Sequence, residues 1–118
     1  MTMKLTRLYT GADGETHFED VEVPLADSGR LTRTSEIEKA AEIVFRETSG
    51  DYSVDWHNVP RRQYVIMLKG EVEIEIGDGT KRRFGPGDVF LAEDTTGRGH
   101  ISRAVNNQPR TSIFVRLE

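Results

Sequence analysis

The sequence contains no cysteine. This absence excludes disulfide bonds, thiolate metal ligands and a cysteine nucleophile. No stretch approaches the roughly eighteen consecutive apolar residues of a membrane-spanning helix. The N-terminal segment MTMKLTRLYTG also lacks the apolar core of a secretion signal. We therefore expect a cytoplasmic protein that does not associate with a membrane.

An excess of positive charge is also lacking. The chain has 16 Lys and Arg residues against 20 Asp and Glu residues, which gives a formal net charge of -4. Nucleic-acid-binding surfaces usually need a basic field or a run of Lys and Arg, and neither is present. We therefore expect no nucleic-acid partner.

The length of 118 residues fits one domain, which can bury roughly two-thirds of the surface of its unfolded chain. We predict a single domain over residues 1–118, with N-terminal strands at about 4–25, a connection at about 26–41 and a barrel at about 42–118. Hydrophobic residues make up 36% of the chain and charged residues 31%. The surface is therefore expected to be highly charged.

The N-terminal part predicts two strands that are separated by the turn Thr10–Gly14. In the second, residues 16–25, apolar and polar residues alternate from Val21 onward, and the same parity would point His17 and Glu19 inward. The polar residues from 26 to 35 predict a surface loop.

Residues 36–48 contain good helix formers at their start and β-branched or aromatic residues at their end. Because Ile43, Val44 and Phe45 favour a strand, we assign residues 42–47 to a strand. A short helical turn is expected before it, at residues 37–39.

The clearest pattern begins at Gln63. Residues 63–68 form an almost continuous apolar run, and residues 71–76 then alternate acidic and aliphatic side chains. The turn at 77–79 allows two hairpin registers, and we prefer the one that sets Glu75 opposite Lys81 and Glu73 opposite Arg83, because opposite charges then face each other. That register also turns Arg82 toward the face of Ile74.

Further turns at 85–88 and 106–109 separate short strands at 89–92, 100–105 and 112–117. About nine or ten short antiparallel strands with regularly spaced turns are typical of a closed β-sandwich or barrel. We therefore predict an all-β fold.

His57, Gln63, Gly70, the segment Gly85–Val89 and His100 together resemble the paired motifs of the cupin superfamily. The resemblance covers roughly residue 44 to the C-terminus. It implies a single-domain antiparallel double-stranded β-helix, the jelly-roll or RmlC-like barrel. It also implies a small-molecule ligand inside the barrel and, in many members, a divalent metal such as Mn, Fe, Ni or Zn.

The metal motif is incomplete in this sequence. His57 matches the first histidine of the family, Val59 stands where the second is expected, and Gln63 stands at the position of the glutamate. His100 matches the last histidine if the preceding loop is longer than usual. The resemblance thus makes His57, His100 and Gln63 the candidate metal ligands. Residues of the neighbouring loops are further candidates: Asp55, Asn58, Glu93 and Asp94.

The predicted ligand pocket contains Gln63, Trp56, Tyr64 and Arg82. Gln63 needs hydrogen-bond partners if it is buried. Trp56 and Tyr64 are expected in the core or barrel lining. An inward Arg82 either reaches the end of the barrel or binds a ligand carboxylate.

Two functions remain open from the sequence. One is a metal-dependent or acid-base enzyme that acts on a small polar metabolite, with His57 and His100 in the site. The other is a non-catalytic cupin that binds a metabolite or serves as an accessory module without a metal. In both cases we expect a homodimer, because the N-terminal strands are weakly patterned on their own and cupins of this size usually pair.

Overall fold

The structure, a computed structural model, describes residues 1–118 and contains twelve β-strands and no helix. No segment therefore forms a helix that is long and apolar enough to cross a membrane. The strands are β1 (Thr2–Thr10), β2 (Thr16–Pro24), β3 (Ala26–Gly29), β4 (Thr32–Thr34), β5 (Ala40–Thr48), β6 (Ser53–His57), β7 (Gln63–Lys69), β8 (Val72–Glu75), β9 (Lys81–Phe84), β10 (Val89–Ala92), β11 (His100–Ala104) and β12 (Arg110–Leu117).

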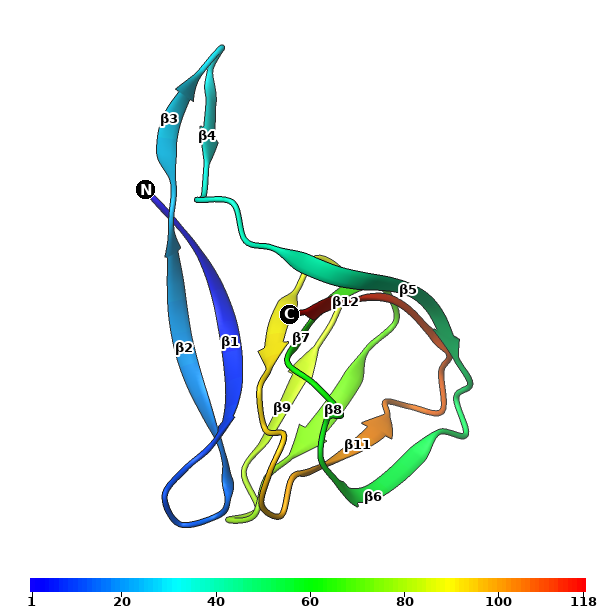
Figure 1. The fold of residues 1–118 in the computed structure, drawn as a ribbon. Helices are drawn as coiled ribbons and strands as arrows, with labels where there is room; N and C mark the ends of the chain where they lie inside the picture. Colours follow the sequence, from blue (N-terminus) through cyan, green and yellow to red (C-terminus); the bar gives the residue numbers. More distant parts are fainter.

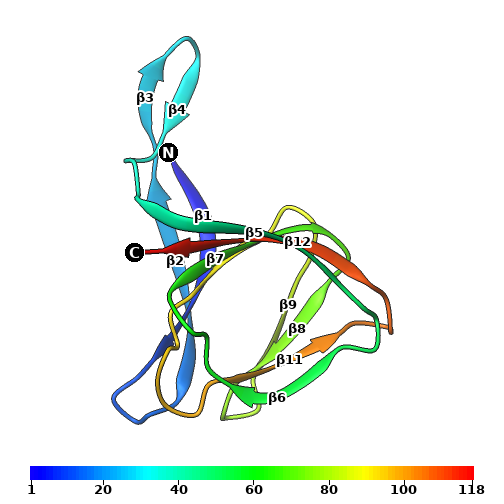
Figure 2. The ribbon, with the colours of Figure 1, turned by 45° about the vertical axis from the view of Figure 1, so that its right-hand side comes forward.

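Two sheets face each other and enclose the barrel (Figures 1 and 2). One has six strands in the order β2-β1-β10-β7-β12-β5, and the other has four in the order β6-β11-β8-β9. The all-β prediction is confirmed. The number of strands exceeds the predicted nine or ten, and one pair, β1 with β10, is parallel rather than antiparallel.

The β8–β9 hairpin has the register that the charge pairing predicted. Val72 lies opposite Phe84, Glu73 opposite Arg83 and Glu75 opposite Lys81. This register puts the apolar side chains of β8 on the inner face, where Val72 is 3% exposed and Ile74 is 2% exposed. A one-residue slip would move them into solvent, so burial and cross-strand charge specify the same pairing.

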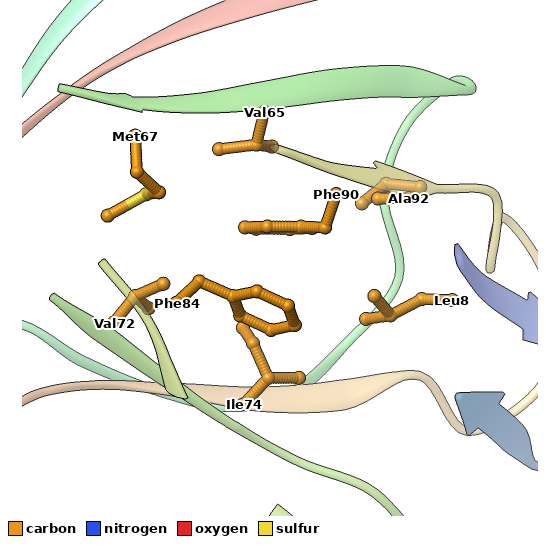
Figure 3. Packing of buried hydrophobic residues seen from close by; sticks show 9 residues of the cluster. Leu8, Val65, Met67, Val72, Ile74, Phe84, Phe90 and Ala92 are labelled. Carbon is orange, nitrogen blue, oxygen red and sulfur yellow. The ribbon is translucent and has the colours of Figure 1, made fainter. Parts of the chain in front are cut away.

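Apolar side chains from both sheets fill one side of the barrel (Figure 3). Phe84 of β9 and Phe90 of β10 meet at its centre, with ring centroids 4.5 Å apart. Leu8 of β1 is fully buried against the same cluster. The core cluster consists of Leu8, Val59, Val65, Met67, Val72, Ile74, Phe84, Phe90 and Ala92.

The edge strand β5 and its neighbour β12 reverse the usual pattern of apolar residues inside and polar residues outside. On β5, Phe45 is 75% exposed and Ile43 is 57% exposed, whereas Arg46 lines the interior. On β12, Arg110 and Ser112 are buried. A polar interior on this side explains the reversal.

The orientation of β2 differs from the prediction. Thr16 is 1% exposed and Phe18 packs on the core, so the even-numbered residues at the start of the strand face inward. His17 lies on the opposite side, where its Nε2 is 2.9 Å from Asp13 and its ring is tilted by 34° against the ring of Tyr9, with centroids 5.6 Å apart. The alternation of Val21 onward is misleading because those residues lie beyond the barrel, on the outer end of the N-terminal hairpin.

The predicted loop at 26–35 is instead the hairpin β3–β4, which projects from the barrel as an arm (Figure 1). Its turn has positive φ at Arg30 and Leu31, residues that rarely adopt this conformation, so the segment lacks the Asn-Gly or Asp-Gly pair that predicts a hairpin. Residues 37–39 do not form the predicted helical turn. Ile37 is 98% exposed, so no apolar burial stabilises a helix there. The strand predicted at 42–47 is confirmed within β5.

Candidate ligand-binding site

A cavity of about 220 Å³ lies inside the barrel, beside the apolar core. Both sheets contribute to its wall, and part of the core forms one side of it. The remaining wall is polar and includes histidine, glutamine, serine and arginine. Its lining residues are Arg46, Thr48, Tyr52, His57, Asn58, Val59, Pro60, Gln63, Val65, Met67, Val72, Ile74, Phe90, Ala92, His100, Ser102, Arg110, Ser112, Phe114 and Arg116.

Strand register arranges this wall into two ends. Arg116 pairs with Gln63 of β7 at one end of β12, and Arg110 pairs with Thr48 of β5 at the other. Six residue steps along β12 lead from Arg110 to Arg116, which corresponds to about 20 Å. In the facing sheet, β6 and β11 run between the same two ends.

The histidine end of the cavity contains His57, His100 and Gln63. His57 ends β6 and His100 begins β11, and the two residues are direct cross-strand partners. Their ring centroids are 4.5 Å apart and the rings are tilted by 56°. The structure therefore brings together the two histidines that the sequence analysis selected, and it adds Gln63 from the opposite sheet.

Hydrogen bonds fix the orientation of both imidazoles. The Nδ1 of His57 donates to the carbonyl oxygen of Asp55 at 2.8 Å, and the Nδ1 of His100 donates to the Asp94 carboxylate at 2.5 Å. Because each Nδ1 carries the proton, each Nε2 of a neutral ring holds a lone pair. Burial lowers the pKa of His57, and nearby His100 adds to the effect. His57 is thus neutral at neutral pH.

Asp94 supports the histidine end from behind. Its side chain is fully buried, and it accepts hydrogen bonds from His100 and from Thr16 Oγ1, the latter at 2.9 Å. The loop that follows Asp94 ends at Gly99, whose backbone packs against the backbone of His57. Gly99 has a φ of +79°, and a Cβ there would lie 2.0 Å from the carbonyl oxygen of His57. Glycine at this position allows β6 and β11 to approach closely enough for the histidines to pair.

Gln63 is 5% exposed, and its Oε1 is buried without a hydrogen-bond partner. An unpaired buried amide oxygen is costly unless water or a ligand satisfies it. Gln63 therefore points to a polar occupant of the cavity.

The arginine end of the cavity contains Arg46, Tyr52 and Arg110. The Cζ of Arg110 lies 4.8 Å from the Tyr52 ring centroid, and the Cζ of Arg46 lies 5.4 Å from the same centroid. Arg46 also approaches the ring of Phe114, at 4.9 Å. Burial, with a further contribution from Arg46, lowers the pKa of Arg110.

Three of the residues predicted for the pocket lie outside the cavity. Trp56 lies beneath Arg98, whose Cζ is 4.1 Å from its ring centroid, since the irregular register of β6 and β11 turns His57 inward instead. Tyr64 is on the outer face of β7, because Gln63 and Val65 occupy the inner face.

The Tyr64 hydroxyl donates to Glu38 at 2.8 Å. Burial and this hydrogen bond raise the pKa of Tyr64 to about 12.

Arg82 is the third residue outside the cavity. It shares a face with Ile74, as predicted, but it extends along the edge of the sheet to Asp20, 2.7 Å away. Its guanidinium stacks on Phe18.

The candidate loop carboxylates do not add a ligand to the histidine pair. Glu93 forms ion pairs with Arg7 and Arg62 on the outside of the barrel. The Asp55 side chain is engaged with the backbone N–H of Trp56. Asp94 is taken up by His100.

The donor set does not fit a tightly held divalent metal ion. Nowhere in the chain do three His, Cys, Asp or Glu residues gather closely enough to bind a metal. The available donors, two imidazoles and the neutral amide of Gln63, provide no negative charge. Three arginines also line the same cavity, and their charge opposes cation binding.

The sequence analysis did not identify the arginines of the cavity. The signal was the alternation in RTSIFVRL, which sets Arg110, Ser112, Phe114 and Arg116 on one face of β12. The opposite face carries Ile113 and Val115, and hydrophobicity alone would favour that face as the inner one. Only the position of β12 in the barrel decides which face is inside.

Comparisons with known proteins support the fold. No protein-family model matches the chain, and no curated protein matches it. Among solved structures, an RmlC-like cupin from Methanocaldococcus jannaschii has a double-stranded β-helix fold and is 14% identical, covering 77% of this chain and 86% of its own, with a TM-score of 0.54.

Two further solved structures span more of this chain. A cupin-like protein from Thermotoga maritima is 16% identical, with coverage of 91% of this chain and 74% of its own and a TM-score of 0.53. A putative ethanolamine utilization protein Q from Salmonella typhimurium is 13% identical, with coverage of 99% and 97% and a TM-score of 0.52. The strand order and these neighbours together show that the chain has the double-stranded β-helix fold that these cupin and cupin-like structures share.

Proposed function

We propose that this cupin binds a small polar metabolite in its barrel cavity and does so without a metal ion. The observation that carries the proposal is the buried Oε1 of Gln63, which has no partner in the protein and lines a cavity with two imidazoles. Ligand pockets typically combine an apolar wall with a few convergent polar groups. The cavity has this composition.

The histidine end adds a second candidate function, proton transfer on the bound ligand. Neutral His57 carries a lone pair on Nε2, and the hydrogen bonds to Asp55 and Asp94 hold the rings of His57 and His100 in place. A neutral imidazole with a fixed orientation suits a general base. His57 would accept the proton, because burial keeps it neutral at neutral pH.

Ligand binding can be tested on protein that is purified without a tag. Native mass spectrometry of the wild-type protein is expected to detect a bound small molecule. If none is retained, a thermal-shift screen of metabolites is expected to find a compound that raises the melting temperature. Gln63→Leu is expected to lose this binding, because it removes the unpaired amide oxygen and keeps a similar volume. His17→Ala is the matched control, since His17 lies outside the barrel. Equal binding by Gln63→Leu would place the ligand elsewhere.

Elemental analysis separates this proposal from the metal-dependent one. We expect substoichiometric metal in the wild-type protein, even after incubation with Mn, Fe, Ni or Zn, because the site lacks an anionic ligand. Stoichiometric metal that disappears in both His57→Ala and His100→Ala, but not in His17→Ala, would establish the metal-binding function instead.

We also propose that the chain forms a homodimer. Support comes from β5, an edge strand of the six-stranded sheet whose outward side chains Phe45 and Ile43 are largely exposed. Exposed apolar residues on an open strand edge favour association with another chain. Light scattering is expected to give the dimer mass at micromolar concentration, and Phe45→Glu is expected to give a monomer. A monomeric wild-type protein would contradict the proposal.

A further inference from the structure

The wall of the cavity carries positive charge, and no carboxylate is among its lining residues. Arg46, Arg110 and Arg116 all line the cavity, and no Asp or Glu residue does. This is unusual for a protein whose formal net charge is -4. The charges of this wall therefore differ in sign from those of the molecule as a whole.

Arg110 is the most enclosed of the three. Arg110 is 7% exposed, and its Nη1 is buried without a hydrogen-bond partner. It forms no ion pair; its main contact is the face of Tyr52. A guanidinium group stays protonated in proteins. Burying such a charge is costly unless it is paired.

Arg46 stands on the same aromatic ring. Both guanidinium groups approach Tyr52, at 4.8 Å for Arg110 and 5.4 Å for Arg46. Two cations on one ring repel each other unless an anion lies between or beside them. Planar guanidinium groups also match the two oxygens of a carboxylate through paired hydrogen bonds.

Arg116 extends the positive wall toward the histidine end. Its Nε is buried without a partner, and its Nη1 is 3.7 Å from Glu42. Arg116 of β12 is the cross-strand partner of Gln63 of β7. An unpaired donor, Arg116 Nε, and an unpaired acceptor, Gln63 Oε1, therefore occur on neighbouring residues. This end suits a group that both donates and accepts, such as a hydroxyl or a second acidic group.

The size and the apolar wall narrow the class of ligand. About 220 Å³ corresponds to roughly seven water molecules at about 30 Å³ each. The middle of the cavity is lined by Val65, Phe90 and Phe114, which suits a short carbon chain better than a multiply hydrated anion such as phosphate.

We propose that the cavity binds a short-chain carboxylate, with its carboxylate group held by Arg46 and Arg110 and its carbon chain lying along the apolar wall toward the histidine end. This inference rests on the proposed role of the cavity as a ligand site. It adds the chemical class of the ligand and the residues that select it. It also assigns a function to two buried arginines that the histidine motif does not involve.

Calorimetry and thermal-shift measurements on the full chain can test this inference. The probes are linear mono- and dicarboxylates from propionate to adipate, the corresponding neutral amides, and inorganic phosphate, all at one ionic strength. We expect at least one carboxylate to bind and to raise the melting temperature, while its amide and phosphate do not. Constant ionic strength removes general screening as an explanation.

Arg46→Met and Arg110→Met are expected to weaken carboxylate binding by about tenfold or more, since each removes a charge-assisted hydrogen bond. The control is Arg83→Met, because Arg83 is exposed and pairs with Glu73 on the outer surface. Arg46 is less buried than Arg110, so its variant provides a test if Arg110→Met folds poorly. If the Arg110→Met protein folds, its ligand-free form is expected to melt at a higher temperature than the ligand-free wild-type protein. A variant that had lost structure would not show this increase.

Several results would overturn the inference. Binding of phosphate alone, or equal binding of a carboxylate and its amide, would exclude selection of a carboxylate. Full carboxylate affinity in both arginine variants would move the anion to another site. In each case the proposed ligand site would still stand if a neutral metabolite bound in a Gln63-dependent manner, so the two proposals fail separately.

Discussion

The two ends of the cavity satisfy their polar groups in different ways. At the histidine end, His57 and His100 have fixed partners within the protein, and a fully buried Asp94 supports them. At the arginine end, Arg110 is almost as buried, but part of its guanidinium has no partner. The imidazoles of the first end are preorganised by the fold, although the neutral Oε1 of Gln63 there is unpaired, whereas the second end holds a buried charge without a partner.

This contrast predicts opposite effects on stability when the charged groups are removed. Asp94→Ala leaves His100 and Thr16 without their acceptor, and breaking such a buried pair costs about 3–5 kcal/mol. Urea denaturation monitored by circular dichroism measures this loss. Asp51→Ala, an exposed site, serves as control and is expected to change stability by less than about 0.5 kcal/mol. Equal losses in both variants would remove the special role of Asp94.

Gly70 tests how the backbone places Arg110. Its φ is +75°, and a Cβ there would lie 2.4 Å from the carbonyl oxygen of Pro109 and 2.9 Å from the Cα of Arg110. Gly70→Ala is expected to cost about 2–3 kcal/mol through strain and displaced backbone. Gly79→Ala is a matched control, because Gly79 has a φ of +88° and nothing within 4 Å. The difference between the two variants isolates the close approach to Arg110.

Arg110→Met is expected to increase the stability of the ligand-free protein by about 1 kcal/mol, because an apolar side chain replaces an unpaired buried charge. The sign is opposite to that for Asp94→Ala. Chemical denaturation at pH 7 measures the free energy of unfolding of Arg110→Met and Asp94→Ala and so tests whether the two changes have opposite signs. A destabilised Arg110→Met protein would indicate that Arg110 is already compensated without a ligand.

Acid should weaken the histidine end. The pKa of His57 is lowered in the folded protein by burial and by His100 and Arg46, while Asp94 acts in the opposite direction. The unfolded chain therefore binds a proton at higher pH than the folded chain. Stability is present above the unfolded pKa of about 6.5 and is lost as pH falls through the folded value. Melting temperatures between pH 5 and 7 should fall less steeply for His57→Gln than for the wild-type protein.

Tyr64→Phe is expected to have the smallest effect. It removes the hydrogen bond to Glu38 on the outer face of β7, which contributes about 1 kcal/mol or less. Carboxylate binding should not change, because Tyr64 does not line the cavity. A large loss of binding would extend the functional site beyond the barrel interior.

Regular alternation made the central part of the fold predictable. Val72 and Ile74 alternate with Glu73 and Glu75, and the charges opposite them are in the matching register. Hydrophobic alternation and cross-strand charge pairing therefore predicted the same hairpin register. By contrast, Phe45 is exposed and Arg46 lines the cavity, so the hydrophobic pattern of β5 indicates the inner face incorrectly.

The candidate site was partly predictable for a related reason. His57, Gln63 and His100 stand in a motif with recognisable glycine turns, and the fold places all three on one cavity. Asp94 was considered as a further ligand, but it supports His100 instead. Arg46 and Arg110 are far apart in sequence and have no motif, so nothing local indicated that they share Tyr52.

The sequence by itself determined the all-β class, the strands around the central hairpin and the residues that form the histidine end. These features depend on turns, alternation and short spacings, which act between neighbours in the chain. The tertiary structure decided which face of β5 and β12 is inside, that β1 joins β10 in parallel, and that Arg110 is enclosed without a counter-charge. These features depend on contacts between distant strands, because burial and electrostatic balance exist only once the barrel has closed.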